Sequence, residues 1–195
     1  RLARPHDEIA DTHWYRPDVD HFLVREAEAA GATYLDEIHL EDVRFDEEGG
    51  VLEGKRKGRP LQVKARFVID ASGPRGFLHR TLKLSEAPMP HMPSTEALYA
   101  HFRDVRPFAD VTQSSFPSAP YPIDDAAVHH VFDGGWVWVL RFNNGITSAG
   151  VAATSLLAGK WNLARGEEAW REVLLSMPSV AAQFSDARAV TPFHH

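Results

Sequence analysis

A turn of small residues follows the apolar run at 67–69, and it is the first place where this sequence could hold a ligand. The turn reads Asp70-Ala71-Ser72-Gly73. Small side chains let a backbone approach a ligand closely, and ligands often bind at the carboxyl ends of buried strands. The same residues would also suit an ordinary connection between a strand and a helix, so this motif alone leaves both interpretations open.

An arginine stands at the start of the first expected helix. Pro17 suits the first helical position and Asp18 suits the positive end of the helix dipole, whereas Arg16 opposes that dipole. A guanidinium there could bind a phosphate or a carboxylate. The alternative is an arginine that is solvated at the surface.

Two tryptophans alternate in the segment Gly-Trp-Val-Trp-Val-Leu-Arg at 135–141. If this segment is a strand, Trp136 and Trp138 lie on the same face of it. Such a pair could line a flat apolar substrate site. The alternative is a sheet face that packs beneath a helix, such as the one expected to carry Trp170.

The elements that would hold Arg16 and the small-residue turn form a first lobe, residues 1–85. Apolar residues at helical spacing predict a helix that begins near Pro17 and ends at Gly31. Alternating residues and turn signals from 32 to 65 predict a meander of short strands. The denser run at 67–69 predicts a buried, parallel-type strand.

A proline-rich linker at 83–95 leads to a second lobe, residues 86–195. Here we expect a strand at 97–102 and a hairpin at 136–151 that turns through Asn144-Gly145, where a primed turn needs positive φ. An amphipathic helix at 167–177 and a short helical turn at 180–184 complete it. The predicted class is α+β, with a helix, a meander and one parallel-type strand followed by a mainly antiparallel sheet with C-terminal helices.

The composition excludes several kinds of site. The net charge is −6 and the pI about 6.0, whereas nucleic-acid-binding surfaces are usually basic. The sequence has no cysteine, so thiolate zinc sites and cysteine nucleophiles are excluded. His129 and His130 are neighbours on an expected strand and should point to opposite faces, and we expect no metal site. With no apolar run of roughly 18 residues and no signal-peptide pattern, we expect a cytoplasmic protein without a membrane span.

Three segments, in this order, resemble the flavin-dependent halogenases and their monooxygenase and reductase relatives. Residues 15–23 resemble the helix start Arg-x-x-Phe/Val-Asp-x-x-Leu of that family, and residues 70–78 resemble its Asp-Cys/Ala-Ser-Gly-x-Arg-Gly-Leu-Leu segment near the flavin. Residues 135–141, with the hairpin after them, resemble its Trp-x-Trp-x-Ile-Pro strand. The similarity runs from about Trp14 to Phe193.

The resemblance implies a fragment of an FAD-dependent oxidoreductase that acts on an apolar or aromatic small molecule. It is compatible with a flavin reductase as the partner that supplies reduced flavin. The family's catalytic lysine belongs to a segment upstream of Arg1, so no catalytic residue is assigned in this chain. The residues assigned to FAD are Arg16, Asp70, Ala71, Ser72 and Gly73, and those assigned to the substrate are Trp136 and Trp138.

The sequence departs from the family pattern at two places. The Gly-x-Gly-x-x-Gly dinucleotide fingerprint is missing and would lie upstream of Arg1, and Leu140 and Arg141 stand where the resemblance has Ile and Pro. Because the strand and phosphate-binding helix of the dinucleotide fold are not in this sequence, we predict that the 195-residue chain, purified alone, is colourless and inactive. A function of another class also stays open, namely a non-catalytic α+β module that binds an apolar ligand.

Overall fold

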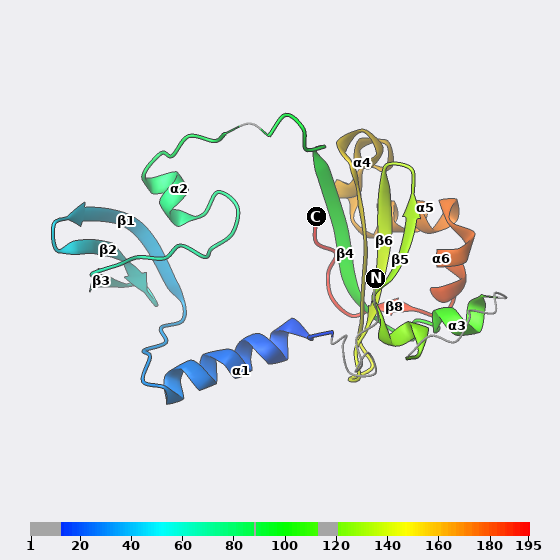
Figure 1. Ribbon diagram of the computed structural model, residues 1–195, viewed down its shortest axis with the longest axis horizontal. Helices are drawn as coiled ribbons and strands as arrows, with labels where there is room; N and C mark the ends of the chain where they lie inside the picture. The colour runs from blue at the N-terminus through cyan, green and yellow to red at the C-terminus, as the bar shows by residue number, and fades with distance from the viewer. Residues whose placement is uncertain (1–12, 88, 113–120) are drawn as a thin grey trace. The chain divides into compact units, whose positions relative to one another are not determined.

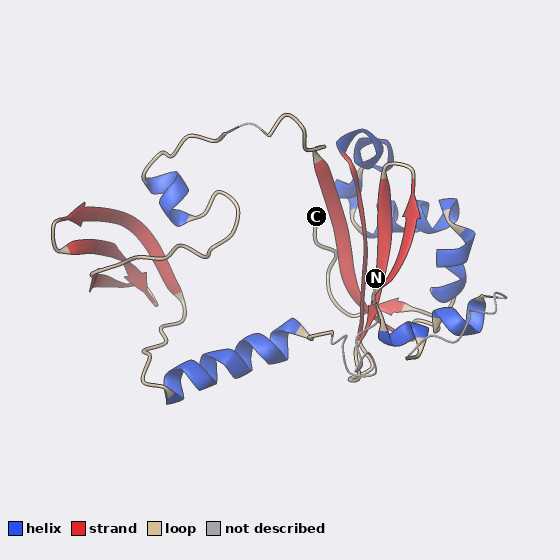
Figure 2. Ribbon diagram, in the orientation of Figure 1, coloured by secondary structure: helices blue, strands red, loops and turns tan. Residues whose placement is uncertain are grey.

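The computed structural model describes residues 13–87, 89–112 and 121–195. The chain forms two compact units, one of Asp20–Pro90 and one that joins the described residues up to Val19 with His91–His195. Each unit has its own antiparallel sheet, with three strands in the first and five in the second (Figure 1, Figure 2). This confirms the α+β class. The two lobes predicted from the sequence, a partial FAD-binding lobe of residues 1–85 and a substrate-binding lobe of residues 86–195, stay predictions.

The first helix, α1 (Arg16–Ala29), begins and ends close to its predicted limits. The Tyr15 carbonyl accepts hydrogen bonds from the backbone N–H groups of Asp18 and Val19, and Gly31 follows the helix with a φ of 96°. No residue of α1 is buried, and Phe22 and Leu23 are 59% and 54% exposed. The apolar spacing therefore predicted the helix correctly, although its two largest apolar side chains are exposed.

The predicted meander is confirmed as β1 (Ile38–Asp46), β2 (Gly49–Arg56) and β3 (Arg59–Ala65). The pairing register shifts between Leu40 and Asp42, so Glu41 is a bulge residue. The bulge explains why apolar residues occupy even positions before it and odd positions after it. In the described part of this unit, Val43 is the one buried apolar side chain.

The prediction of a buried parallel strand at 67–69 is wrong for this structure. These residues lie outside any strand, and Phe67 and Ile69 are 79% and 80% exposed. A strand needs a neighbour that completes its backbone hydrogen bonds, and no described strand pairs with this segment. The short helix α2 (Phe77–Thr81) follows.

The second unit is built on a sheet with the strand order β5-β6-β7-β4-β8. Its strands are β4 (Thr95–Arg103), β5 (Val128–Phe132), β6 (Gly135–Arg141), β7 (Thr147–Thr154) and β8 (Arg188–Ala189). The helical segments are α3 (Phe108–Val111), η2 (Ile123–Asp125), α4 (Ser155–Trp161), η3 (Leu163–Arg165), α5 (Glu167–Ser176) and α6 (Pro178–Gln183). Helices α5 and α6 confirm the two helical segments predicted at the C-terminal end.

The hydrophobic core lies between one face of this sheet and helices α4 to α6 (Figure 1). The strands contribute alternate residues to it, because side chains alternate between the two faces of a sheet. Trp170 of α5 is 3% exposed and packs against Phe102 and Phe184, with ring centroids 5.7 and 5.3 Å apart. The buried strand residues are Leu98, Ala100, Phe102, Val137, Val139, Ala149, Val151 and Ala153.

The predicted hairpin between β6 and β7 is confirmed, but its turn differs from the one expected. The Gly145 N–H donates to the Phe142 carbonyl and the Phe142 N–H donates to the Ile146 carbonyl. Gly145 has a φ of 76°, whereas neither Asn143 nor Asn144 has a positive φ. The loop therefore has three residues, a type I turn followed by a left-handed glycine, instead of a two-residue primed turn.

Candidate functional site

The face of the five-stranded sheet that points away from helices α4 to α6 carries the candidate site, and we call it the open face. Val137 and Val139 point into the core and are at most 1% exposed, so Trp136 and Trp138 point the other way. Trp136 is 40% exposed. The two tryptophans therefore share a face, as predicted, and they do not pack beneath the helix of Trp170. The open face also carries Tyr99, His101 and Leu140.

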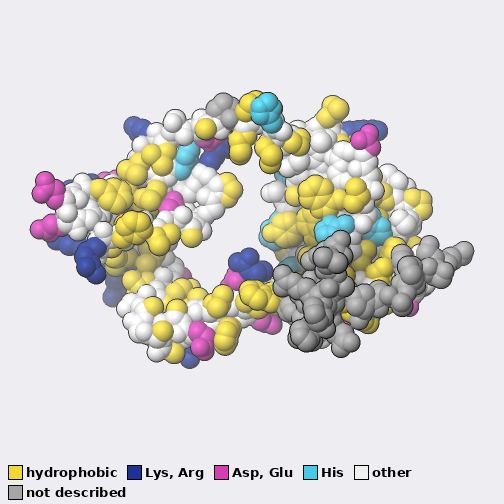
Figure 3. All heavy atoms as spheres, viewed as in Figure 1, with side chains coloured by type: hydrophobic (Ala, Val, Ile, Leu, Met, Phe, Trp, Pro, Cys, Tyr) yellow, Lys and Arg dark blue, Asp and Glu magenta, His cyan; other side chains and the backbone are white. Residues whose placement is uncertain are grey.

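Tyr99 of β4 lies beside Trp138 of β6, although β7 separates their strands. Both residues pair with Gly150 of β7, one from each side. The two ring centroids are 6.3 Å apart and the ring planes are inclined by 40°. On the other side of Tyr99, the His194 ring stacks on it at 5.2 Å with an inclination of 28°. Figure 3 shows hydrophobic and histidine side chains gathered over the strands of this unit.

The C-terminal segment holds His194 in this position. The N–H of Tyr99 donates to the His194 carbonyl over 3.0 Å, and the N–H of His194 donates to the Tyr99 carbonyl over 2.9 Å. The Thr191 hydroxyl accepts from the backbone N–H of His101. His194, the second-to-last residue, is thus integrated into the sheet.

Tyr15 connects the start of α1 with the open face. Its ring lies 5.7 Å from that of His101 and 5.3 Å from that of Phe142, measured between centroids. Burial, and secondly the charge of His194, lower the pKa of His101 below its usual value. The lowered pKa favours the neutral form of the His101 imidazole. Arg16, an exposed residue, follows Tyr15 directly and so begins α1 beside this end of the open face.

The turn at 70–73 is held together by its own polar groups. The Asp70 carboxylate accepts from the Ser72 hydroxyl, from the Ser72 N–H over 3.0 Å and from the Leu78 N–H over 2.7 Å. The hydrogen bond from the Ser72 hydroxyl, followed by those from the two N–H groups, lowers the pKa of Asp70. The Ser72 oxygen also accepts from the Phe77 N–H. Asp70 and Ser72 therefore cap helix α2, which is the structural role that the sequence left open.

Ala71 and Gly73 are the members of this turn that present backbone to the surroundings. Both are exposed, and Gly73 has a φ of 91° with no atom of the chain within 4 Å of the place where a side chain would begin. Arg16 belongs to one compact unit and Asp70 to Gly73 to the other. Trp136 and Trp138 belong to the same unit as Arg16.

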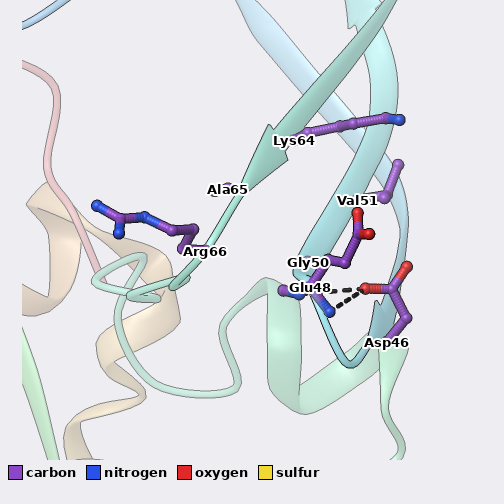
Figure 4. Close-up of a pocket in the computed structure, with 8 residues that line it drawn as sticks. Asp46, Glu48, Gly50, Val51, Lys64, Ala65 and Arg66 are labelled. Atoms are coloured by element: carbon purple, nitrogen blue, oxygen red, sulfur yellow. Dashed lines mark hydrogen bonds between the residues drawn. The ribbon is translucent and has the colours of Figure 1, made fainter.

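A small pocket of about 160 Å³ lies at the β1–β2 turn of the meander (Figure 4). Of its two carboxylates, those of Asp46 and Glu48, the Asp46 carboxylate accepts from the N–H groups of Glu48 and Gly49 and so closes the turn. Lys64 and Arg66 extend in opposite directions in Figure 4. Because these charges diverge, the pocket does not form a site for a charged ligand.

Histidines and acidic residues form no cluster suited to a metal ion in the ranges 13–87, 89–112 and 121–195. His129 is exposed, whereas His130 bonds with the Gln183 side chain over 2.8 Å, so these neighbours point to opposite faces of β5 as predicted. The longest helix in the described part of the chain, α1, has 14 residues, and no helix there is long and apolar enough to cross a membrane.

Two solved structures, one of them of a halogenase with bound FAD, share this fold. The structure of halogenase PltM in complex with phloroglucinol and FAD matches with a TM-score of 0.76 and 24% identity, over 93% of this chain and 37% of that one. A flavoprotein/dehydrogenase from Cytophaga hutchinsonii matches with a TM-score of 0.72 and 23% identity, over 92% and 41% of the two chains. At these identities the likeness concerns the fold alone.

The sequence comparisons give the family. The tryptophan halogenase family matches residues 12–191, and the chain belongs to it. Monodechloroaminopyrrolnitrin halogenase PrnC of Pseudomonas fluorescens is 30% identical over 91% of this chain and 31% of its own length. Tetracycline 7-halogenase of Kitasatospora aureofaciens is 31% identical over 91% and 33%. The chain thus spans about a third of these relatives, and the matches favour the flavoprotein hypothesis over the non-catalytic binding module.

Sequence reasoning found the two tryptophans but missed their neighbours on the open face. Tyr99 was assigned only to a strand, and His101, His194 and Tyr15 were given no role in a site. A period-two pattern places residues on a face, but it does not show which strands become neighbours. The register between β4 and β7 is the missing information.

Proposed function

We propose that this chain is part of an FAD-dependent oxidoreductase of the halogenase type, in which the open face borders the substrate cavity. The observation that carries the proposal is an aromatic sheet face, opposite the helix-packed core, in a chain that belongs to the tryptophan halogenase family. The substrate is an apolar or aromatic small molecule. The relatives' names, which specify monodechloroaminopyrrolnitrin and tetracycline halogenases, support that class.

We propose that FAD contacts Arg16 and the turn from Asp70 to Gly73. The exposed backbone at Ala71 and Gly73 fits a close approach of a planar cofactor, whereas the Asp70 carboxylate and the Ser72 hydroxyl are used within the turn. The role of the Asp70 carboxylate and the Ser72 hydroxyl is to hold the turn rigid. The Arg16 guanidinium suits a phosphate oxygen. When bound, the flavin supplies the redox chemistry, and the protein orients the substrate and excludes water.

The unit Asp20–Pro90 supports this proposal through its exposed apolar surface. Exposed apolar surface can mark a contact region, and we propose that the exposed apolar side chains of this unit pack against other parts of a complete FAD domain. The side chains concerned are Phe22, Leu23, Tyr34, Phe45, Phe67 and Ile69, each at least 50% exposed. A cytoplasmic location and a flavin reductase as partner belong to the same proposal.

The decisive variant is Trp138→Ala in the protein encoded by the complete reading frame. We expect turnover of an aromatic substrate to fall roughly tenfold or more, because a stacking surface is lost, while bound FAD and melting temperature stay close to those of the unaltered protein. Leu175→Ala is the control, because Leu175 is 84% exposed on α5, on the other side of the sheet. Equal losses of turnover, FAD and melting temperature would instead show a purely structural tryptophan.

The FAD assignment has its own test. We expect the product of the complete reading frame to bind FAD and to show a flavin absorption spectrum, and the 195-residue chain alone to be colourless. Gly73→Val in the complete protein should weaken FAD binding, because a branched side chain would fill the exposed backbone position. A 195-residue preparation that is yellow with stoichiometric FAD would contradict the assignment.

A further inference from the structure

A row of residues crosses the open face at the level of Trp138. The strand pairings place His129, Trp138, Gly150, Tyr99 and His194 side by side, in this order, from β5 to the C-terminal segment. Four of the five carry a ring, and the one residue without a side chain lies between the two largest rings. The row therefore differs from an ordinary mixed sheet surface.

Gly150 lets the two rings come together. A Cβ atom at this position would lie 2.5 Å from Cζ2 of Trp138 and 2.5 Å from Cβ of Tyr99. Contacts under 3.0 Å are essentially never seen for real Cβ atoms, so the Trp138 ring and the β4 residue Tyr99 would have to move. Because Gly150 has no side chain, the rings of Trp138 and Tyr99 form one continuous two-ring surface.

Trp136 has no such partner. Across β7 it faces Ala152, and Ala152 in turn faces Ala97 of β4. The only two-ring surface that crosses β7 in the described part of the open face is therefore the pair of Trp138 and Tyr99. His194, stacked on Tyr99 and held by two backbone hydrogen bonds, supports the tyrosine ring from its other side.

We propose that Tyr99 is a specificity-determining residue, which together with Trp138 selects planar aromatic substrates over saturated ones of the same size. This inference rests on the proposed function of the open face. A planar ring can lie in contact with both inclined rings, and each aromatic contact adds to what the burial of apolar area contributes. A puckered, saturated ring gains only the contribution from the burial of apolar area.

The test compares naphthol with its saturated counterpart decahydronaphthol, because the two differ mainly in planarity. Affinities are measured by calorimetry with the FAD-loaded protein from the complete reading frame. Tyr99→Leu should weaken naphthol binding by roughly 3- to 10-fold and decahydronaphthol binding by less than about twofold. Tyr99→Phe keeps the ring and should retain the selectivity, and Leu175→Ala should change neither affinity.

The outcomes separate this inference from the function on which it rests. An unchanged ratio of the two affinities in Tyr99→Leu overturns the role of Tyr99, and the proposed function still stands if Trp138→Ala lowers turnover. If both variants leave affinity and turnover unaltered, both proposals are wrong, and another part of the protein covers the open face. Tyr99 is 39% exposed, which favours a folded variant. Should circular dichroism show that Tyr99→Leu is unfolded, Tyr99→Ile carries the same expectation.

Discussion

Trp138 and Tyr99 lie on strands that are not neighbours, yet their ring centroids are only 6.3 Å apart across Gly150. The distance between them depends on the absence of one side chain. This relationship connects the tryptophan motif of β6 with a strand that lies about 40 residues earlier in the sequence, and it leads to the first prediction.

Gly150→Ala should destabilise the protein by about 1–3 kcal/mol, because the new methyl group overpacks the contact with Trp138 and also meets the Leu98 carbonyl oxygen at 2.5 Å. The free energy of unfolding, from denaturant titration, measures this change. Gly159→Ala is the matched control. Gly159 lies within α4 and has no atom within 4 Å of its missing side chain, so the same substitution there should stabilise by about 0.5–1 kcal/mol. Equal effects at both glycines would contradict the argument.

Trp170→Ala should cost about 3–5 kcal/mol, because Trp170 fills the core between Phe102 and Phe184. Thermal unfolding, followed by circular dichroism, would show it as a lower melting temperature. Trp14→Ala provides the comparison, since Trp14 is 60% exposed and its loss should change stability by at most about 0.5 kcal/mol. If Trp170→Ala left the melting temperature unchanged, the helices would not depend on this aromatic cluster.

Arg141→Met should cost about 1–3 kcal/mol, because the Arg141 guanidinium donates a 2.6 Å hydrogen bond to the carbonyl of Val105, a buried residue. Methionine keeps the apolar stem but has no donor. Arg171→Met is the control, since Arg171 forms an exposed ion pair with Glu167 and should contribute at most about 1 kcal/mol. Similar losses of unfolding free energy in the two variants would show that the contact with Val105 has no special weight.

Asp70 predicts a local dependence on pH. Its pKa is lowered from the ordinary 3.8, so the carboxylate stabilises the turn fully above that value, and this contribution is lost as the pH falls through the lowered pKa. Hydrogen exchange of the Leu78 amide should therefore accelerate at acidic pH, beyond its intrinsic pH dependence. In Asp70→Asn this additional acceleration should be absent.

The control for this experiment is Asp46→Asn, which alters the comparable carboxylate at the β1–β2 turn. It should leave the hydrogen-exchange rate of the Leu78 amide, and its dependence on pH, the same as in the unaltered protein. If Asp70→Asn retained the acid-dependent loss of protection, another group would have to be responsible for it.

Local sequence patterns determined most of the individual elements. Pro17 and Gly31 mark the ends of the first helix, and the apolar spacing of α5 and the alternation in β6 are each a property of one short segment. The shift of apolar positions around Glu41 even reports the bulge of β1. These features follow from backbone preferences and side-chain periodicity, which act within a few residues. For the same reason the motifs at 15–23, 70–78 and 135–141 were enough to indicate the family.

Pairings between distant segments were decided only by the tertiary structure. Phe67 to Ile69 has the composition of a buried strand, but a strand forms only where a neighbour completes its hydrogen bonds, and none of the described strands does so. The left-handed Gly145 needed a three-residue loop, because the neighbouring asparagines keep negative φ. The roles of Tyr99, His194 and Gly150 depend on a register that sets residues about 50 and 95 positions apart side by side. No local preference encodes that register, since it results from packing the whole sheet against one core.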